Sequence, residues 1–459
     1  MTGVSLNRKI LTLALPAVLY TITKSSFSII DAYWVGKLGS LELAGLTVAT
    51  FIIWGVISLT EVISLGLNTL VAQAVGAGDN LLSKKISTVN IVNSFFFSVV
   101  LGWAMIPVIP GLYYSMNLND TEIFRANQYL IPILIGLPCF ALRDTISSVF
   151  RGYGDTKTPF YLLLIAVALN FFITPLLIFG IEIGGERVLE FGLSGAAFAT
   201  LFSYLLSYVI GYIIARRREL LHSIKKYTLH LPIIKETFKI GTPVALNGMA
   251  FSMIYVFVAR FVAEFGPAGL AAMGIGHKSE SVAFQICMGF TLASTIMVGQ
   301  NVGAGRKNDA EKLAWRIVAI CGSIILVYSL GLFVFSADIA SIFTTDPAVI
   351  IAASDYNKIA AAILIFTAVE VVLEGAFSGA GDTVPPALIT MPFNVLRIPL
   401  AAFLAPELGL NGIWIAIAIS NVCKGILMAM WFKRGMWKLK SLKIFEEKDH
   451  LQEIKAVDK

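Results

Sequence analysis

Charged and titratable side chains are scarce in this sequence of 459 residues. Aspartate, glutamate, lysine and arginine make up only 14% of the chain, whereas hydrophobic residues make up 57%. A water-soluble protein of this length needs much more charged surface, so the composition excludes a soluble globular protein. There are only four histidines, and the sequence shows no metalloprotease or nucleophile-elbow motif. A membrane-embedded enzyme is therefore disfavoured.

Cysteine is equally rare, and its four positions are irregularly spaced in apolar stretches. This spacing fits neither a disulfide framework nor a metal site, and we expect the thiols to pack as small residues. The glycine-rich stretches VGAGD (75–79) and RGYGDT (151–156) lack the Lys-Ser/Thr ending of a phosphate-binding loop. We expect tight turns there, with Asp155 and Asp382 capping the following helices. Nothing in these motifs implies a cofactor.

Long apolar segments are what the chain has in abundance. Segments of about 20 or more residues, which is the length of a membrane-spanning helix, recur along the whole sequence. Membrane-spanning strands would be about 10 residues long and alternate in polarity, and these segments do neither. We therefore predict an all-α membrane protein with twelve transmembrane helices. They lie at about 10–36, 45–75, 88–114, 129–150, 159–180, 194–215, 238–262, 272–302, 313–338, 358–379, 385–404 and 411–432.

Basic residues gather in alternate connections between these helices. The run Arg216–Arg218 is one such cluster, whereas the opposite side holds little beyond Lys37, Arg125 and Arg187. The positive-inside rule then places both termini in the cytoplasm of a multi-pass protein of the cell membrane, inner or plasma. The first apolar run is too long for a cleavable signal peptide. Beside a membrane helix, a basic stretch indicates orientation and lipid contact, so we expect no nucleic-acid partner.

The two halves of the chain repeat each other. LPAVLY (15–20) matches TPVALN (242–247), and RGYGDT matches SGAGDT (378–383), both at the same offset in the numbering (243 − 16 and 381 − 154). VAQAVGAGD also matches VGQNVGAGR at this offset, so six helices are duplicated. Because six is even, the halves share one orientation, and we expect a pseudo-two-fold axis along the membrane normal. The predicted domains are an N-lobe (1–215), a cytoplasmic connector (216–236), a C-lobe (237–435) and a cytoplasmic tail (436–459).

Polar residues inside the predicted helices are the candidates for function, because a charge in hydrocarbon costs at least ~2.5 kcal/mol. Pro16 can kink the first helix and is a candidate hinge. A buried ion-pair network that only fixes packing is the alternative interpretation of the charges. The N-lobe candidates are Lys24, Asp31, Glu61, Arg143, Asp144, Asn170 and Thr174, and the C-lobe polar cluster is Glu280, Gln285, Glu370, Glu374 and Arg397.

Several stretches also carry a family resemblance: LPAVLY, DAYWVGKLG, VAQAVGAGD, FRGYGDTKTP, NFFITPLLIFG and their second-half counterparts. In this order, from about residue 8 to 435, the chain resembles the multidrug and toxic compound extrusion (MATE) family. Its details are similar to the prokaryotic branch that includes DNA-damage-inducible proteins. The resemblance implies two six-helix lobes around a central cavity. It also implies export of amphipathic, often cationic small molecules in exchange for H⁺ or Na⁺.

The resemblance further implies an ion-coupling site in the first lobe. Asp31 matches the family's aspartate on the first helix, and Thr200 matches a threonine on the sixth. The family's Asn-x-x-x-Asp-Pro motif here reads Asn170-Phe-Phe-Ile-Thr174-Pro175, so a threonine replaces the second aspartate. Thr174 can coordinate a cation, but it cannot carry a proton. Na⁺ would therefore be held, if at all, by Asp31, Asn170, Thr174 and Thr200.

The missing acid leads to a specific hypothesis about Asp144. We hypothesise that this acid on the fourth helix titrates together with Asp31. Lys24 would then favour ionisation of both carboxylates or occupy the site as an internal cation, with Glu61 and Arg143 as further modulating charges. Because a lysine would compete with Na⁺, we favour H⁺ as the coupling ion.

An alternative function is a flippase for lipid-linked oligosaccharides or another amphipathic lipid. Lys24, Arg143 and Arg397 could hold its pyrophosphate. A strongly positive cavity would favour the flippase, and a negative one an exporter of cations. A channel fits less well, because duplicated lobes with kinked helices suit alternating access. We expect a monomer that acts on small amphipathic molecules within membrane lipid.

Overall fold

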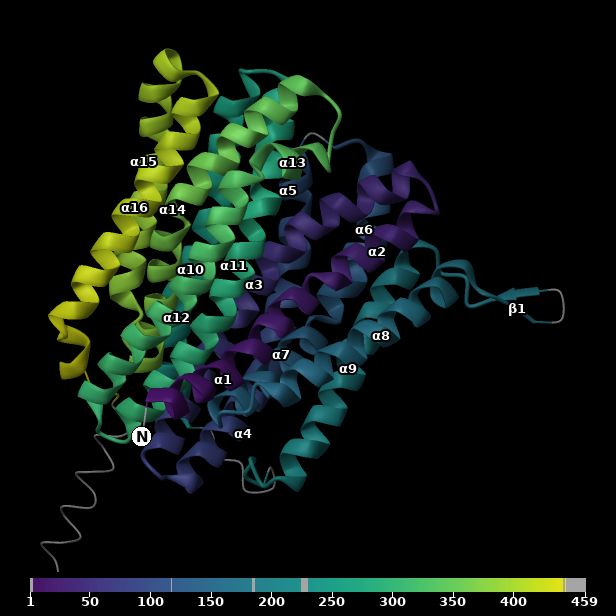
Figure 1. The fold of residues 1–459 in the computed structure, drawn as a ribbon. Coiled ribbons are helices and arrows are strands. Elements are labelled where there is room, and N and C mark those ends of the chain that lie inside the picture. The colour runs from purple at the N-terminus through teal and green to yellow at the C-terminus, as the bar shows by residue number, and fades with distance from the viewer. Residues whose placement is uncertain (1–2, 117, 184–185, 224–229, 441, 443–459) are drawn as a thin grey trace, which may run out of the picture. The chain divides into compact units, whose positions relative to one another are not determined.

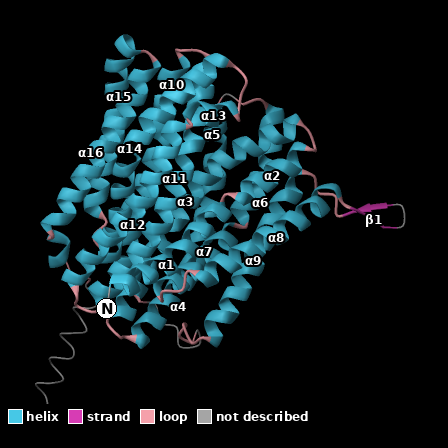
Figure 2. Ribbon diagram, viewed as in Figure 1, coloured by secondary structure: helices cyan, strands magenta, loops and turns pink. Residues whose placement is uncertain are grey.

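The computed structural model describes residues 3–116, 118–183, 186–223, 230–440 and 442. The centre of the predicted connector (224–229) and the predicted tail beyond residue 442 lie outside the described residues. Almost all of the described chain is helical (Figure 2). Within the described ranges, ten helical segments are long and apolar enough to cross a membrane, and a bent helix pair makes an eleventh. The 33-residue α10 (Leu231–Ala263) supplies a twelfth long helix. The prediction of an all-α, multi-pass membrane protein is confirmed.

The helices form two compact units (Figure 1). One comprises Leu19–Thr242, which we call the N-terminal unit. The other comprises Met1–Val18 and Pro243–Lys459, which we call the C-terminal unit. Both boundaries fall beside the repeated prolines, Pro16 in α1 (Gly3–Lys24) and Pro243 in α10. The compact units therefore divide inside two helices, whereas the sequence repeat divides in the 216–236 connector.

The N-terminal unit contains the helices up to the connector. They are α2 (Ser26–Gly36), α3 (Ser40–Gly76), α4 (Asn80–Met105), the 3-10 turn η1 (Ile106–Val108), α5 (Ile109–Ser115), α6 (Asp120–Ile135), α7 (Leu137–Gly152), α8 (Lys157–Phe179) and α9 (Leu193–Arg217). A short antiparallel hairpin, β1 (Ile181–Ile183) with β2 (Glu186–Val188), projects beyond the ends of α8 and α9 (Figure 1). The sequence patterns did not predict this hairpin.

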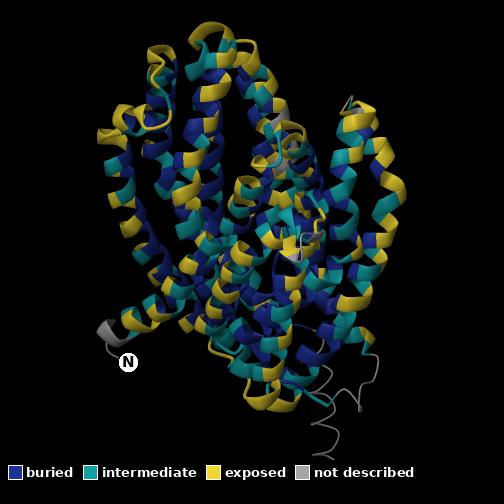
Figure 3. Ribbon diagram, turned by 90° about the vertical axis from the view of Figure 1, so that its right-hand side faces the viewer, coloured by how far each residue is buried: buried dark blue, intermediate teal, exposed yellow. Residues whose placement is uncertain are grey.

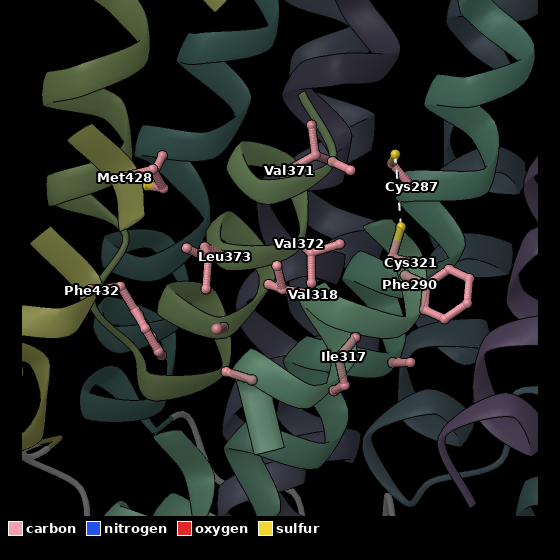
Figure 4. Packing of buried hydrophobic residues seen from close by; sticks show 14 of the residues in the cluster. Cys287, Phe290, Ile317, Val318, Cys321, Val371, Val372, Leu373, Met428 and Phe432 are labelled. Atoms are coloured by element: carbon pink, nitrogen blue, oxygen red, sulfur yellow. Dashed lines mark hydrogen bonds between the residues drawn. The ribbon is translucent and has the colours of Figure 1, made fainter. Parts of the chain in front are cut away.

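The C-terminal unit contains the remaining helices. They are α11 (Pro267–Gly303), α12 (Lys307–Val334), α13 (Ser336–Ser341), α14 (Pro347–Ala380), α15 (Val384–Leu408), α16 (Leu410–Arg434) and the 3-10 turn η3 (Met436–Leu439). Its apolar core includes Cys287 and Cys321, whose sulfurs lie 3.9 Å apart beside Phe290 and Val318 (Figure 4). All four cysteines of the chain are free thiols, as the sequence predicts.

Two of the predicted helices are interrupted, and the second interruption has a visible cause. The first predicted helix consists of α1 and α2, which meet at Ser25. The fourth consists of α6 and α7, which bend by 50° at Gly136. Pro138 in the first turn of α7 has no N–H to continue the hydrogen bonding of α6. A Cβ at Gly136 would also meet the end of the Leu201 side chain, so a larger residue there would require Leu201 to move.

The repeated glycine-aspartate turns have diverged between the halves. Gly154 and Gly381 both have positive φ, 86° and 78°, which explains the glycine in each motif. Asp155 accepts hydrogen bonds from the backbone N–H groups of Lys157 (3.0 Å) and Thr158 (2.9 Å), which confirms the predicted cap of α8. Asp382 instead pairs with Lys440 from the segment that follows α16.

Exposed residues recur along many of the helices (Figure 3). Many of the large exposed side chains are apolar, such as Trp54, Phe96 and Phe403, which are 62%, 62% and 75% exposed. In water such a surface would be strongly unfavourable, but it suits contact with lipid chains. Inside the N-terminal unit, α3 and α10 pack closely because Gly241 lies against the backbone of Val62.

Candidate functional site

Asp31 lies at the centre of a buried polar cluster in the N-terminal unit. It is only 3% exposed on α2. Its Oδ2 accepts hydrogen bonds from the Tyr129 hydroxyl (2.6 Å) on α6 and from the Thr200 hydroxyl (3.2 Å) on α9. Asn170 on α8 donates from Nδ2 to Thr200 Oγ1 (2.9 Å). Four helices therefore converge on one carboxylate.

This cluster has spare oxygen atoms. Asp31 Oδ1, Asn170 Oδ1 and Thr174 Oγ1 are buried and have no hydrogen-bond partner among the described residues. Thr174 lies one helical turn from Asn170, so both project from the same face of α8. Buried polar atoms are usually paired, so these oxygens are available to accept a proton or to coordinate a cation. Oxygen atoms of a carboxylate, an amide and a hydroxyl suit a hard cation, and the carboxylate alone suits a proton.

Tyr129 was missed by the sequence analysis. A signal was available, because a tyrosine hydroxyl within an apolar helix needs a partner. Its side chain is 6% exposed, and its hydroxyl donates the shortest hydrogen bond that Asp31 receives. Tyr129 is therefore a direct hydrogen-bond partner of the Asp31 carboxylate.

The other charged candidates of the N-terminal unit form a separate cluster. Lys24 Nζ lies 2.6 Å from Glu61 Oε1 and 3.9 Å from Asp144 Oδ2. Arg143 Nη1 donates to Asp144 Oδ1 (2.5 Å) and to the Tyr20 hydroxyl (2.8 Å). Arg143 is 1% exposed, and its Nε and Nη2 have no hydrogen-bond partner among the described residues. The two carboxylates of this cluster are thus matched by two cations.

The two clusters are neighbours that share an aromatic wall. Tyr204 lies one turn after Thr200 on α9, and its ring stacks on Phe27, one turn before Asp31 (centroids 4.6 Å apart). The Arg143 guanidinium lies over the same Tyr204 ring, 5.4 Å from its centroid. Asp31 and Asp144 therefore belong to different hydrogen-bonded groups. Both groups border on Tyr204, because Arg143 of one lies over its ring and Thr200 of the other lies one turn before it on α9.

A third polar group lies in the C-terminal unit. Glu370 on α14 forms an ion pair with Lys424 on α16 (3.0 Å), and both side chains are almost fully buried. Glu374, one turn along α14, interacts with Lys424 and is hydrogen bonded to Asn247. Lys424 was not among the residues predicted from the sequence, although it is the single lysine of the predicted helix 411–432.

The remaining candidates of this unit are more dispersed. Arg397 on α15 donates to Ser420 Oγ (3.1 Å) and Asn421 Oδ1 (2.7 Å) on α16. Glu280 on α11 accepts a hydrogen bond from the Tyr356 hydroxyl (2.8 Å) and lines a small pocket with Tyr356 and Asn421. Gln285 also lies on α11, and Pro16 lies within the continuous helix α1.

Comparison with known proteins decides the family. The MatE family model matches residues 16–176 and again residues 243–403. The chain belongs to the MatE family. The two MatE matches begin at the prolines that align in the sequence repeat, Pro16 and Pro243, which confirms the duplication read from the sequence. The resemblance to the multidrug and toxic compound extrusion family is confirmed as well, while the choice of the DNA-damage-inducible branch stays a prediction.

Relatives of this MatE protein match over nearly their whole lengths. A probable multidrug resistance protein NorM of Thermotoga maritima is 27% identical over 453 residues, which is 95% of this chain and 94% of that protein. The multidrug resistance protein MdtK of Yersinia enterocolitica is 24% identical and covers 92% and 94%. An FAD transporter of Shewanella oneidensis is 25% identical and covers 92% and 93%.

Solved structures show the same fold. A MOP superfamily transporter from Pyrococcus furiosus matches with a TM-score of 0.85 at 20% identity, over 96% of this chain and 99% of that one. The Vibrio cholerae MATE transporter VcmN in its bent form matches with a TM-score of 0.84 at 20% identity, over 94% and 97%. These structures show that the chain shares their fold, and the MatE match to both halves identifies it as a membrane transporter built from two repeated helical halves.

Proposed function

We propose that this MatE protein is a secondary active exporter of amphipathic, cationic small molecules, coupled to H⁺ or Na⁺ entry by alternating access. The observation that carries the proposal is the Asp31 cluster. A buried carboxylate with unpaired oxygen atoms around it can take up one positive charge and release it again. The relatives named as multidrug resistance proteins support small organic molecules as the exported class.

The coupling site in this proposal consists of Asp31, Tyr129, Asn170, Thr174 and Thr200. With a proton as the coupling ion, the protonated Asp31 would donate to one of the spare oxygens. With Na⁺, the spare oxygens would coordinate the ion directly. In both cases the charge of Asp31 is neutralised, and its hydrogen bond from Tyr129 changes strength. Neutralising this carboxylate removes a charge from the interior of the unit, which biases the packing of α2 against α6, α8 and α9.

The orientation of the transporter is part of the proposal. The basic run Arg216–Arg218 ends α9, and Lys433 and Arg434 end α16. Each repeat therefore ends in basic residues, and this supports a cell-membrane protein with both termini in the cytoplasm. Export then means movement away from that side, against entry of the coupling ion.

Dye transport in proteoliposomes tests the function. Uptake of ethidium would be measured for the wild type and Asp31→Asn, first with a pH gradient and then with a Na⁺ gradient. We expect one gradient to drive uptake and the Asp31→Asn protein to lose it. Asp338→Asn, a change at an exposed aspartate on α13, is the matched control and should keep wild-type uptake. Equal uptake by Asp31→Asn would contradict the proposed site.

The second acid requires its own experiment. Asp144 remains a predicted partner of Asp31, but its closest contact is the ion pair with Arg143. The variants Tyr129→Phe and Asp144→Asn distinguish an Asp31–Tyr129 pair from an Asp31–Asp144 pair. If Asp31 and Tyr129 act together, Tyr129→Phe should shift the pH dependence of uptake. If Asp144 titrates with Asp31, Asp144→Asn should abolish coupling, and unchanged uptake by this variant would exclude the pair.

The flippase remains the alternative outcome of the same assay. Ethidium uptake that fails under both gradients in a folded wild type would contradict export of cations. Transfer of a fluorescent lipid-linked sugar between the leaflets would then be measured. The balanced charges of the Lys24 cluster do not form the strongly positive surface that a pyrophosphate requires, which supports the exporter.

A further inference from the structure

The exposure of Lys24 and Glu61 is unusual for charges inside membrane helices. Their side chains are 39% and 35% exposed, although Lys24 lies within the Leu6–Gly36 span and Glu61 lies near the middle of the 37-residue α3. Exposure to lipid at that depth would be costly for an ammonium or a carboxylate. The exposed sides of this pair therefore face water, where a dissolved molecule can reach them.

Lys24 is also redundant for neutralising the buried acid beside it. Asp144 already has a direct partner in Arg143, at 2.5 Å, whereas Lys24 is 3.9 Å from it. Glu61 is half-exposed and can be solvated without a partner. Removal of Lys24 therefore leaves no fully buried charge alone, unlike removal of Arg143. A structural role would be better served by a buried cation, since exposed ion pairs contribute little stability.

A buried group with spare hydrogen-bonding capacity lies in the same cluster. Arg143 is 1% exposed, yet its Nε and Nη2 have no hydrogen-bond partner among the described residues. Arg151 lies nearby, 5.3 Å from the centroid of the Tyr20 ring, while its Nη2 donates to Ser148. Asp144 therefore keeps a cation when Lys24 moves away, whereas Glu61 loses the cation with which it is paired.

We propose that Lys24 is a tethered competitor for the substrate. Its ammonium occupies the carboxylate patch, Glu61 with Asp144, that a lipophilic monovalent organic cation takes during transport. Release of the cation lets Lys24 return to Glu61, so the patch is never left with a net negative charge. This inference rests on the proposed export of cations, and it places substrate recognition on a cluster separate from the Asp31 coupling site.

Equilibrium binding tests the proposal without any ion gradient. Binding of radiolabelled tetraphenylphosphonium to purified full-length protein in detergent would be measured for the wild type and for Lys24→Gln. Lys24→Gln should bind roughly fivefold more tightly, which is the factor expected when a half-exposed competing ion pair is removed. Lys24→Arg keeps the competing charge and should bind like the wild type. Glu61→Gln should bind more weakly, because it removes half of the patch.

The matched control is Lys37→Gln. Lys37 is an exposed lysine after the same predicted helix, and its ammonium lies over the Tyr33 and Trp34 rings, each 4.5 Å away. Loss of Lys37 changes the net charge of the protein as much as loss of Lys24 does, but it leaves the carboxylate patch intact. Lys37→Gln should therefore bind tetraphenylphosphonium with the affinity of the wild type. Melting curves confirm that each variant is folded.

Two results would contradict the proposal that Lys24 competes with the substrate. They differ in whether they also contradict the proposed export of cations. If the wild type binds the cation but Lys24→Gln binds it no more tightly, Lys24 does not compete, while the proposed export of cations is unaffected. If neither protein binds it, both the competitor and the cationic substrate class are wrong. A swapped protein, Lys24→Glu with Glu61→Lys, gives an independent check, since it keeps the pair and should bind like the wild type.

Discussion

Removing Lys424 should destabilise the C-terminal unit strongly. Lys424 and Glu370 are 4% and 5% exposed, and their charged atoms lie 3.0 Å apart between α16 and α14. Glu374 lies one turn from Glu370 on the same face of α14, so the ammonium serves two carboxylates. Lys424→Met keeps the length of the side chain but removes the ion-pair partner of Glu370 and a cation that also interacts with Glu374.

The size of the expected destabilisation follows from the burial of the Lys424–Glu370 pair. Removing one partner of a buried ion pair costs about 3–5 kcal/mol, because the remaining charge is uncompensated. The same change at an exposed pair costs about 0–1 kcal/mol. A second change, Glu370→Leu, removes one of the stranded carboxylates and should recover a large part of the loss. If the double variant is more stable than Lys424→Met alone, the two residues interact as a buried pair. Two independent losses of packing would instead add up.

The assay is unfolding of the purified protein in detergent, by heat or by titration with SDS. The control is Lys433→Met, at the exposed end of the same helix α16. We expect Lys433→Met to melt like the wild type and Lys424→Met to melt far below it. A Lys424→Met protein as stable as the control, or a double variant no more stable than the single one, would refute the reasoning.

Two further predictions concern packing and pH. Gly241→Ala should destabilise the N-terminal unit by about 1–3 kcal/mol, because a Cβ there would clash with the Val62 backbone; Gly331→Ala on α12, where a Cβ meets open space, should be harmless in the same melting assay. Burial alone would raise the pKa of Asp155, but hydrogen bonds from Thr158 and Arg218 lower it below the ordinary value of 3.8. Because its folded pKa is depressed, its stabilising contribution is present above that value and is lost on acidification. The melting temperatures of wild type and Asp155→Asn should therefore differ at pH 6 and converge towards pH 3; an equal gap at both would contradict this.

The fold could be predicted from the sequence because its signals are long and repeated. Apolar length defines the membrane helices, and the offset shared by the repeated motifs defines the duplication, which the MatE match confirms. The breaks inside helices were less visible. Nothing local marks the separation of α1 from α2 at Ser25, and the hairpin formed by Ile181–Ile183 and Glu186–Val188 is too short to leave a clear pattern.

The candidate site could be predicted only in part. Asp31, Asn170 and Thr200 come together as the resemblance implied, from three helices that are far apart in sequence. The charged partners of Lys24 are Glu61 and Asp144. The argument that Lys24 would compete with Na⁺ beside Asp31 is therefore no longer supported. A sequence indicates the depth of a residue in the membrane, but the facing direction depends on how each helix is rotated by its neighbours.

The grouping of Met1–Val18 with the C-terminal unit has a consequence for biosynthesis. Within that unit Asn7 accepts a hydrogen bond from Arg316 (2.9 Å), and Val18 packs against Gly289. Both partners belong to the second half of the chain, so Asn7 and Val18 cannot make these contacts until that half has been synthesised. Such long-range pairing slows folding. The start of α1 therefore stays without these partners while the whole N-terminal unit is synthesised. It is among the last segments to pack into its final position.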